Sequence, residues 1–309
     1  MPSLPQAIRI TDVGPRDGLQ NEPGIVSLDD KVALIDLLSA SGVAEVEAGS
    51  FVNPQWVPQL ADSEAVFKRI KRPQGVVFSA LVPNEKGLER AMSLGVKHRP
   101  DKVAIFTAAS EMFSLKNTNA TIEQTVERFK PVIVQAHAAG IPVRAYISCV
   151  VQCPYLGPIS PSAVTDVVQR LIDVGIDPNR DDIDLGETIG VAAPSDIDRL
   201  YEAMHSVVEP VQTTLHLHDT RGTALTCAYR AMQLGVASFD VSCGGLGGCP
   251  YAPGAAGNLA TEDLLYLCER MGVQTGVDRK LHFAAGRSIR AALKRPLPGR
   301  VFSVDGGTF

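Results

Sequence analysis

The stretch that decides the fold of this chain is Thr213-Thr-Leu-His-Leu-His-Asp219, an apolar and β-branched run with two histidines two positions apart. Residues i and i+2 of an extended strand point to the same side, so the rings of His216 and His218 are expected to converge. Two neutral imidazole nitrogens in that arrangement are typical ligands of a divalent cation. We therefore expect this strand to end at a metal site.

Seven other strand-like segments occur along the chain, and amphipathic helix-like segments lie between them. This alternation predicts parallel strands joined by helical crossovers, and a closed (β/α)8 TIM barrel accounts for the number of strands. A doubly wound sheet is disfavoured, because no dinucleotide-binding loop follows the first strand. The expected strands are residues 8–13, 44–48, 76–82, 102–106, 143–150, 182–185, 213–217 and 238–241, and the expected helices include residues 27–41, 121–139, 160–174, 194–208 and 223–234.

Capping residues support these helices, since serine is common where a helix begins and glycine where it ends. Two more helical segments, 261–271 and 279–294, follow the last strand. We therefore predict a single TIM-barrel domain over residues 1–309, with extra C-terminal helices in an extension of about residues 261–309. The expected helix starts are Ser27, Ser160 and Ser195, and the expected stops are Gly42, Gly95, Gly140, Gly175 and Gly235.

The composition is that of an ordinary globular protein, with 45% hydrophobic and 20% charged residues. A net charge of -5 gives no basic footprint, so nucleic acid is not an expected partner. No apolar run approaches the roughly 18 residues that cross a bilayer, and the N-terminus lacks the apolar core of a secretory signal. The six cysteines form no C-x-x-C pair, which fits a reducing compartment. We expect a cytoplasmic enzyme that does not bind membranes.

Polar residues follow several of the expected strands, at the end of a barrel where active sites lie. Asp17 comes after the first strand, and Asn258 follows a glycine-rich segment beyond the eighth. With His216 and His218 they would form a ligand set of nitrogen and oxygen without thiolate. That set favours Mg²⁺ or Mn²⁺ over structural zinc, while catalytic zinc or cobalt stays open. The alternative for the histidines is a hydrogen-bonded pair in a buried strand.

Three further residues are candidates for the chemistry. Arg16 presents a permanently charged, planar set of donors that suits an oxyanion, although a surface ion pair with Asp17 is the alternative. Glu47, at the end of the adjacent strand, could orient this arginine or form a simple structural salt bridge with it. Cys249 lies in the glycine-rich segment, where a mobile loop could bring its thiol into the site for proton transfer. A tight turn with an inert cysteine is the alternative.

The chain resembles the 3-hydroxy-3-methylglutaryl-CoA lyase family of metal-dependent barrels. The resemblance covers residues from about 8 to beyond 270, and its most specific part is the last of the six motifs that carry it. These are VGPRDGLQNE, EAGSFVNPQWVPQLAD, SCVVQCPY, LGETIG, HLHDT and GGLGGCPYAPGAAGNLATEDL.

The resemblance implies a TIM barrel that cleaves 3-hydroxy-3-methylglutaryl-CoA to acetyl-CoA and acetoacetate. It implies Mg²⁺ or Mn²⁺ bound by Asp17, His216, His218 and Asn258, and it suggests a homodimer. Arg16 would stabilise the thioester enolate while Glu47 holds it, Asp17 or a histidine would act as the base that takes the hydroxyl proton, and Cys249 would transfer a proton to the product. The residues expected to contact the substrate are Arg16, Gln20 and Glu187.

The chain departs from the family pattern at three positions. Glu187 stands where Asp is expected in LGDTIG, Asp184 where a small residue is usual, and Arg221 where an aromatic residue follows HDT. These changes predict a carboxylate and a guanidinium near the rim and hence an altered acyl substrate, more polar or bulkier. The rival functions are a Claisen synthase or 2-oxo acid aldolase on the same barrel, and a non-catalytic metal- or CoA-binding barrel.

Overall fold

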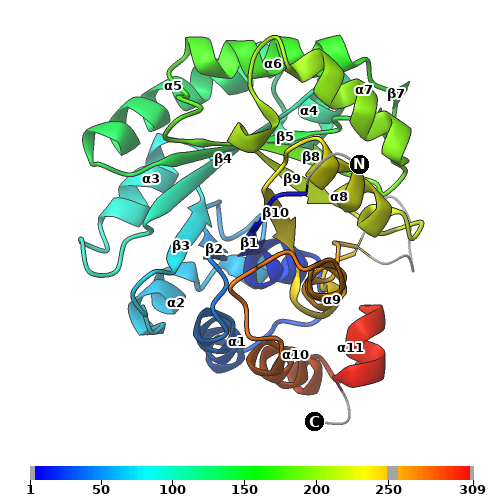
Figure 1. Ribbon diagram of the computed structural model, residues 1–309. Coiled ribbons are helices and arrows are strands. Elements are labelled where there is room, and N and C mark those ends of the chain that lie inside the picture. Colours follow the sequence, from blue (N-terminus) through cyan, green and yellow to red (C-terminus); the bar gives the residue numbers. More distant parts are fainter. Residues whose placement is uncertain (1–3, 249–256, 307–309) are drawn as a thin grey trace.

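The fold was analysed in a computed structural model of the 309-residue chain, which describes residues 4–248 and 257–306. Eight parallel strands close into a barrel with helices around it, which confirms the predicted TIM barrel (Figure 1). The barrel strands are β1 (Arg9–Asp12), β2 (Glu45–Ser50), β3 (Val77–Leu81), β4 (Lys102–Ala108), β5 (Val143–Ser148), β8 (Asp182–Glu187), β9 (Thr213–Leu217) and β10 (Ser238–Val241), and β10 pairs with β1 to close the ring.

The helices that were expected between strands are present with slightly shorter bounds. Their starts follow from side-chain caps: the hydroxyls of Ser27 and Ser160 accept the backbone N–H groups of Asp30 and Ala163. The expected start at Ser195 is wrong, because Pro194 takes the first helical position and Ala193 is the N-cap. These helices are α1 (Leu28–Ala40), α5 (Ile122–Ala138), α6 (Pro161–Asp173), α7 (Pro194–Met204) and α8 (Ala224–Gln233).

Several short elements were not predicted. Each spans at most eight residues, which is too short for a clear hydrophobic period in the sequence. They are the helices α2 (Ser63–Arg69), α3 (Glu85–Met92), α4 (Glu111–Thr118) and α11 (Arg300–Asp305) and the two-stranded hairpin β6 (Gln152–Cys153) and β7 (Gly157–Pro158).

Helices beyond the last barrel strand cover one side of the barrel. α9 (Thr261–Met271) has the bounds expected from the sequence, and α10 (Arg279–Leu293) ends one residue earlier than expected. α10 packs against α1, and α11 packs against α9 (Figure 1). The segment between α9 and α10 returns to the first strand, where Gln274 bridges with Ala7. The C-terminal helices therefore contact elements from the beginning of the chain.

The strands separate two kinds of buried environment. In β5, Val143, Ala145 and Ile147 belong to the hydrophobic core that lies between the strands and the helices. The alternate residues Arg144 and Tyr146 are also buried, but they bond to polar side chains of other barrel strands. The period of two along a strand therefore directs apolar side chains outward and polar ones into the barrel.

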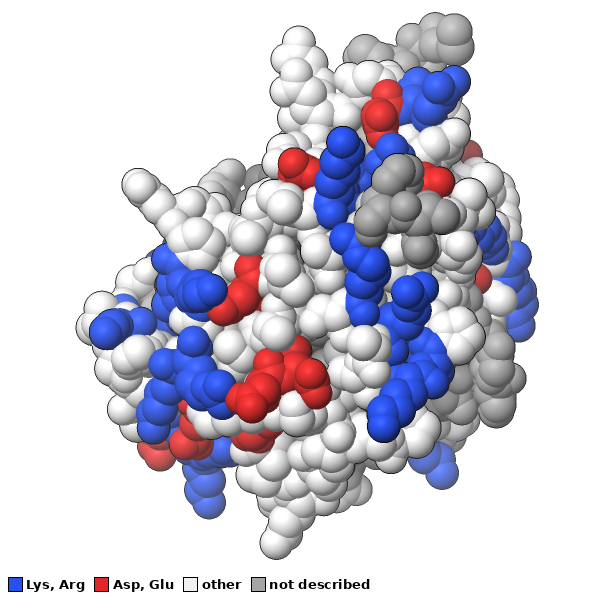
Figure 2. Space-filling view, turned by 90° about the horizontal axis from the view of Figure 1, so that it is seen from below, with Lys and Arg blue, Asp and Glu red and all other residues white. Residues whose placement is uncertain are grey.

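The surface carries charges of both signs. Figure 2 shows a row of basic side chains to the right of centre, and acidic and basic side chains next to one another on the left. Within residues 4–248 and 257–306, no helix is long and apolar enough to cross a membrane.

Candidate functional site

Three of the predicted metal ligands lie together at the carboxyl ends of the strands. Asp17, in the π-helical turn Gly14–Gly18 after β1, and His216 and His218, at the end of β9, each offer a ligand atom within 4.8 Å of the others. The rings of the two histidines have their centroids 5.3 Å apart. The i, i+2 spacing therefore places both imidazoles on the same side, as the sequence predicted.

Asn258 completes this group. Its backbone forms an isolated bridge with His218, and its amide Nδ2 donates to Asp17 Oδ2 at 2.8 Å and to the Leu246 carbonyl at 3.1 Å. The other amide atom, Asn258 Oδ1, is buried without a hydrogen-bond partner, and so is Nδ1 of His218. Buried polar atoms without partners are costly unless a ligand satisfies them. These orphaned atoms, beside a carboxylate and a second imidazole, fit a divalent cation.

The protonation states at this group also suit a cation. Burial, followed by the neighbouring His216, lowers the pKa of His218 to about 4, so its ring is neutral at physiological pH. Burial alone would raise the pKa of Asp17, but Arg16 and the two histidines outweigh it and lower the pKa. Cation ligation requires a neutral imidazole and an ionised carboxylate. Both groups are already in those forms.

Asp240 on β10 orients His216 from inside the barrel. His216 Nδ1 lies 3.3 Å from Asp240 Oδ2. Burial raises the pKa of Asp240, but Arg144 and His216 outweigh it, and the net pKa lies well below its usual range. Burial lowers the pKa of His216, but the hydrogen bond to Asp240 and the charge of Asp17 outweigh it and raise the pKa. Because an ionised carboxylate only accepts, His216 Nδ1 carries a proton, and Nε2 offers its lone pair to a ligand when the ring is neutral. This is the carboxylate–histidine arrangement that orients metal ligands.

Arg16 lies beside the ligand group and is held in one orientation. Its Nε donates to Glu47 Oε2 at 2.6 Å, and its Nη1 donates to Asp17 Oδ1 at 2.8 Å. The guanidinium lies over the ring of Tyr146, 5.4 Å from its centroid, and the Tyr146 hydroxyl lies 3.2 Å from the same Glu47 oxygen. The contact between Glu47 and Arg16 matches the arrangement expected from the sequence.

Glu187 ends β8 near His216 and is almost completely buried. Burial raises its pKa to about 7. Hydrogen bonds from the backbone N–H groups of residues 189–191 oppose this rise, and the one from Val191 has the largest effect. A carboxyl group with a pKa close to neutral can both give and take a proton. Gln20 follows the π-helical turn and is half-buried.

Of the other two departures from the family pattern, Arg221 follows β9 at the carboxyl ends of the strands, where a guanidinium was expected, but Asp184 lies elsewhere. Asp184 is not near the rim: β8 continues to Glu187, two residues beyond the predicted end, so Asp184 lies inside the barrel. Its carboxylate accepts a hydrogen bond from Arg144 Nη1 at 3.2 Å. Arg221 donates to the carbonyls of Ile189 and Gly190, which hold the loop that follows Glu187.

The remaining predicted residue, Cys249, lies outside the described residues, so the structure does not place its thiol. The segment that leads toward it is described as far as Gly248. Among the described residues, Cys149, Cys153, Cys227, Cys243 and Cys268 are free and buried.

The sequence reasoning missed the residues that support the site inside the barrel. Asp240 binds His216, Tyr146 bonds to Glu47, and Arg144 donates to Asp240 at 2.5 Å. A signal was present, because Arg144 and Tyr146 alternate with apolar residues in a strand that is otherwise core. A charged residue at such a position must have buried partners.

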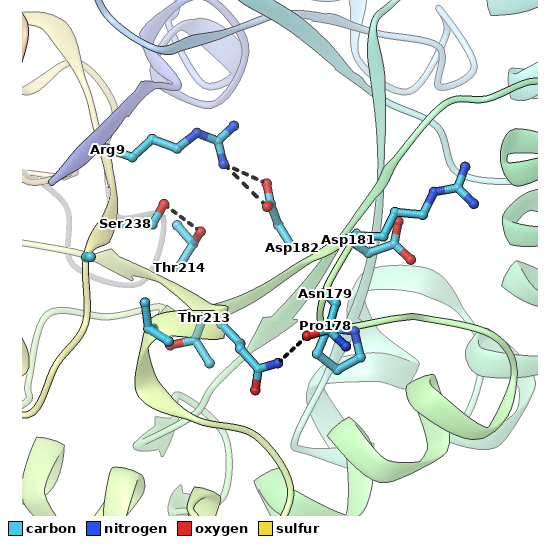
Figure 3. A pocket seen from close by; sticks show the side chains of 12 residues that line it. Arg9, Pro178, Asn179, Asp181, Asp182, Thr213, Thr214 and Ser238 are labelled. Carbon is cyan, nitrogen blue, oxygen red and sulfur yellow. Dashed lines mark hydrogen bonds and ion pairs between the residues drawn. The ribbon is translucent and has the colours of Figure 1, made fainter.

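A cavity of about 270 Å³ lies at the opposite end of the barrel, where the strands begin. Figure 3 shows Arg9 pointing toward Asp182 and Thr214 toward Ser238 around this cavity. Of its charged groups, Arg9 is paired with Asp182, and Asp181 is paired with His137. Because active sites of TIM barrels lie at the carboxyl ends of the strands, we assign the chemistry to the other end.

Comparisons with known proteins agree with the motifs found in the sequence. A family model described as HMGL-like matches residues 7–289. The mitochondrial hydroxymethylglutaryl-CoA lyase of Macaca fascicularis is 46% identical and covers 97% of this chain and 90% of its own. The 3-hydroxy-3-isohexenylglutaryl-CoA/hydroxy-methylglutaryl-CoA lyase of Pseudomonas aeruginosa is 46% identical and covers 94% of each chain. The crystal structure of the HMG-CoA lyase of Bacillus subtilis has a TM-score of 0.93 and 41% identity, over 98% of this chain and 99% of its own.

Proposed function

This chain belongs to the HMGL-like family, and we propose that it is a divalent-metal-dependent lyase that cleaves 3-hydroxy-3-methylglutaryl-CoA to acetyl-CoA and acetoacetate. The observation that carries this proposal is the ligand group beside a fixed arginine. Asp17, His216 and His218 converge within 4.8 Å, and Arg16 donates to Asp17 at the edge of that group. A cation site next to a guanidinium suits a reaction in which a hydroxyl is deprotonated while an enolate forms.

Four residues would hold the cation: Asp17, His216, His218 and Asn258. The orphaned Asn258 Oδ1 and the ionised carboxylate of Asp17 supply oxygen, and the histidines supply nitrogen. When bound, Mg²⁺ or Mn²⁺ would act as a Lewis acid that lowers the pKa of the tertiary hydroxyl of the substrate. The choice of Mg²⁺ or Mn²⁺ as the native metal belongs to this proposal.

The side chains around the site then assist cleavage of one carbon–carbon bond of the substrate. A base removes the hydroxyl proton, the C2–C3 bond breaks, and its electron pair moves to C2 and the thioester oxygen. Arg16 stabilises this enolate oxygen, because Glu47 and Asp17 fix the guanidinium before the charge develops. C2 then takes a proton and leaves as acetyl-CoA, and the carbonyl formed at C3 belongs to acetoacetate.

Proton transfer involves two groups in this proposal. Glu187 is suited to exchange a proton with the substrate, because its raised pKa of about 7 lies close to the working pH. Cys249 would protonate C2 from the glycine-rich segment. Gln20, half-buried after the π-helical turn, would contact the acyl group together with Arg16 and Glu187.

The direct test is product analysis with 3-hydroxy-3-methylglutaryl-CoA and Mg²⁺ or Mn²⁺, without an added 2-oxo acid. The proposal expects acetyl-CoA and acetoacetate in equal amounts, and no turnover after chelation of the metal. A requirement for a 2-oxo acid would assign a synthase or aldolase instead. Binding of the thioester without any turnover would assign a non-catalytic barrel.

A second candidate is a lyase for a bulkier or more polar 3-hydroxyacyl-CoA. It is supported by the Pseudomonas relative, whose name includes the 3-hydroxy-3-isohexenylglutaryl thioester. Of the three departures, Glu187 and Arg221 lie at the reacting end, where Arg221 is bonded to the loop after Glu187, whereas Asp184 is bound to Arg144 inside the barrel. Competition between 3-substituted glutaryl-CoA and citramalyl-type thioesters decides it. A clear preference for the methyl compound excludes this candidate.

The remaining expectations concern the state of the protein in the cell. We propose a homodimer of single-domain subunits that works in the cytoplasm, although several relatives are named as mitochondrial. Light scattering coupled to size exclusion tests the dimer. Fractionation of cells that produce the protein tests the compartment.

A further inference from the structure

We propose that His282 is a positioning residue. Through Asp12 and Glu262 it holds in place the backbone at the beginning of two segments of the site. The first segment is the π-helical turn with Arg16 and Asp17, and the second is the glycine-rich segment after β10. His282 lies on α10, outside the barrel, and touches none of the groups proposed to meet the substrate. For its kinetic consequence this inference rests on the proposed lyase function.

The first link is the carboxylate of Asp12, the last residue of β1. Its Oδ1 accepts the backbone N–H of Gly14 at 2.9 Å and that of Cys243 at 3.3 Å. Its Oδ2 accepts the hydroxyl of Thr261 at 2.8 Å and lies 3.2 Å from His282 Nε2. One carboxylate therefore joins Gly14, the first residue of the arginine turn, to Cys243, the second residue after β10, and to Thr261 at the start of α9.

The second link is the carboxylate of Glu262 on α9. Both of its oxygens accept the backbone N–H of Gly244, at 2.8 and 3.1 Å. His282 Nδ1 lies 3.2 Å from Glu262 Oε1, an ion-pair distance without the geometry of a hydrogen bond, so the imidazole lies between the two carboxylates. Gly244 has a φ of 61°, a left-handed conformation that fixes the direction of the glycine-rich segment as it leaves the barrel.

The charge of the imidazole makes it hard to replace. The side chains of Asp12, Glu262 and His282 are fully or almost fully buried, and the groups that face the ring are Asp12 from β1, Glu262 from α9 and the Cys243 thiol. Burial lowers the pKa of His282, but Glu262 and Asp12 outweigh it and raise the pKa to about 9. A buried imidazolium thus balances two buried carboxylates, and its removal leaves them uncompensated.

The same cluster does not need a metal to explain it. Cys243, Glu262 and His282 have ligand atoms within 4.8 Å of one another, a spacing that a cation could use. However, the Glu262 oxygens already accept from Gly244, and burial raises the pKa of the Cys243 thiol well above its usual value. A neutral thiol and a protonated imidazole are poor ligands. The cluster is better explained as an ionic clamp.

A clamp at this place acts on function because of what it holds. Gly14 lies two residues before Arg16 and three before Asp17, so a shift of its anchor moves both side chains. A displacement of about 1 Å in a positioning element can cost on the order of 100-fold in rate. Release of the Gly244 N–H from Glu262 would loosen residues 243–248.

The test compares His282→Gln with a matched control, His137→Gln. His137 is also a histidine paired with a buried carboxylate, with Nε2 at 3.0 and 3.1 Å from the oxygens of Asp181, but it lies away from both segments. Three properties are measured on the full chain: Mn²⁺ affinity by titration, kcat and KM separately, and hydrogen exchange at residues 14–18 and 243–248. A melting curve of each variant shows how far it is destabilised.

For His282→Gln we expect kcat to fall by about 10- to 100-fold with KM within about threefold, and Mn²⁺ affinity to fall about tenfold. Exchange should accelerate in both segments. His137→Gln should lower the melting temperature without any of these changes. If both variants have the same kcat, metal affinity and exchange in these segments, His282 is merely structural and the inference is overturned.

If His282→Gln does not fold, Thr261→Val tests the same anchor at Asp12. This variant removes only the hydroxyl that donates to the Asp12 carboxylate. We expect a kcat loss of about three- to tenfold and faster exchange at the arginine turn; no change in either result overturns the inference. Failure of the lyase function is distinguishable. In that case wild-type protein gives no acetyl-CoA, while Mn²⁺ affinity and hydrogen exchange still test the clamp.

Discussion

The inside of the barrel and the layer between the barrel and its helices are both buried, but they are built from opposite kinds of residue. In β8, Ile183 and Leu185 face the layer and belong to the hydrophobic core, whereas Asp182 and Asp184, which alternate with them, bond to Arg144. A TIM barrel is usually filled by branched apolar side chains. Here a network of ion pairs around Arg144 fills much of the interior, next to a small apolar cluster of Leu81, Ala104 and Tyr146.

This difference separates stability from function. Buried ion pairs are weak contributors to stability, because desolvation offsets their attraction, so the apolar layer must supply most of it. The interior pairs end at the reacting groups: Arg144 binds Asp240, which binds His216, and Tyr146 bonds to Glu47, which binds Arg16. The interior therefore orients the site, and changes in the two regions should have different consequences.

The largest effect is expected for Arg16→Ala, at the upper end of the interior chain. Loss of a donor to a developing oxyanion typically costs about 100- to 1000-fold in kcat, or about 3 to 4 kcal/mol of barrier. Mn²⁺ affinity should change little, because Arg16 is not a proposed ligand. Steady-state kinetics and Mn²⁺ titration check this, and an equal loss of both would contradict the role of Arg16.

The next effect is expected for Asp240→Asn, one step lower in the same chain. The amide can no longer fix the protonated Nδ1 of His216 as an ionised carboxylate does, and loss of such a partner costs about 10- to 100-fold in metal affinity or activity. Mn²⁺ titration measures the affinity. An unchanged affinity would mean that the interior chain does not orient His216.

A pH dependence is expected from the buried imidazolium of His282 on α10, outside the barrel. Its pKa is raised from 6.5 to about 9 by folding, so its contribution to stability is complete below about pH 6.5 and is lost as the pH rises toward 9. The free energy of unfolding of wild type should therefore fall relative to His282→Gln across this window, on the order of 2 kcal/mol. Urea unfolding at a series of pH values tests this. A pH-independent difference would show that His282 is neutral in the folded protein.

The smallest effect is expected for Ile183→Val in the apolar layer. Removal of one buried methyl group typically lowers the free energy of unfolding by about 0.5 to 1.5 kcal/mol. Urea unfolding measures the loss, and kcat should stay within about twofold of wild type. A large loss of kcat with this small loss of stability would break the distinction between the two regions.

The sequence predicted what depends on local pattern. The bounds of β9 and β10 and of α9 agree with those expected, because period and capping are local properties. The convergence of His216 and His218 also followed from the period of a strand.

What the sequence did not reveal depends on which distant residues meet. Asp240 and His216 are 24 residues apart, and His282 and Asp12 are 270 apart. Nothing local in either segment indicates its partner. Asp184 was misplaced for a related reason: the true end of β8 decides whether a side chain lies at the rim or inside the barrel.

The most direct test of the account is anomalous scattering at the manganese edge from a crystal soaked in Mn²⁺. We expect one strong peak at the carboxyl ends of the strands, within about 2 to 2.5 Å of the ligand atoms of Asp17, His216, His218 and Asn258. A peak among Cys243, Glu262 and His282, or no peak between the two histidines of β9, would contradict it.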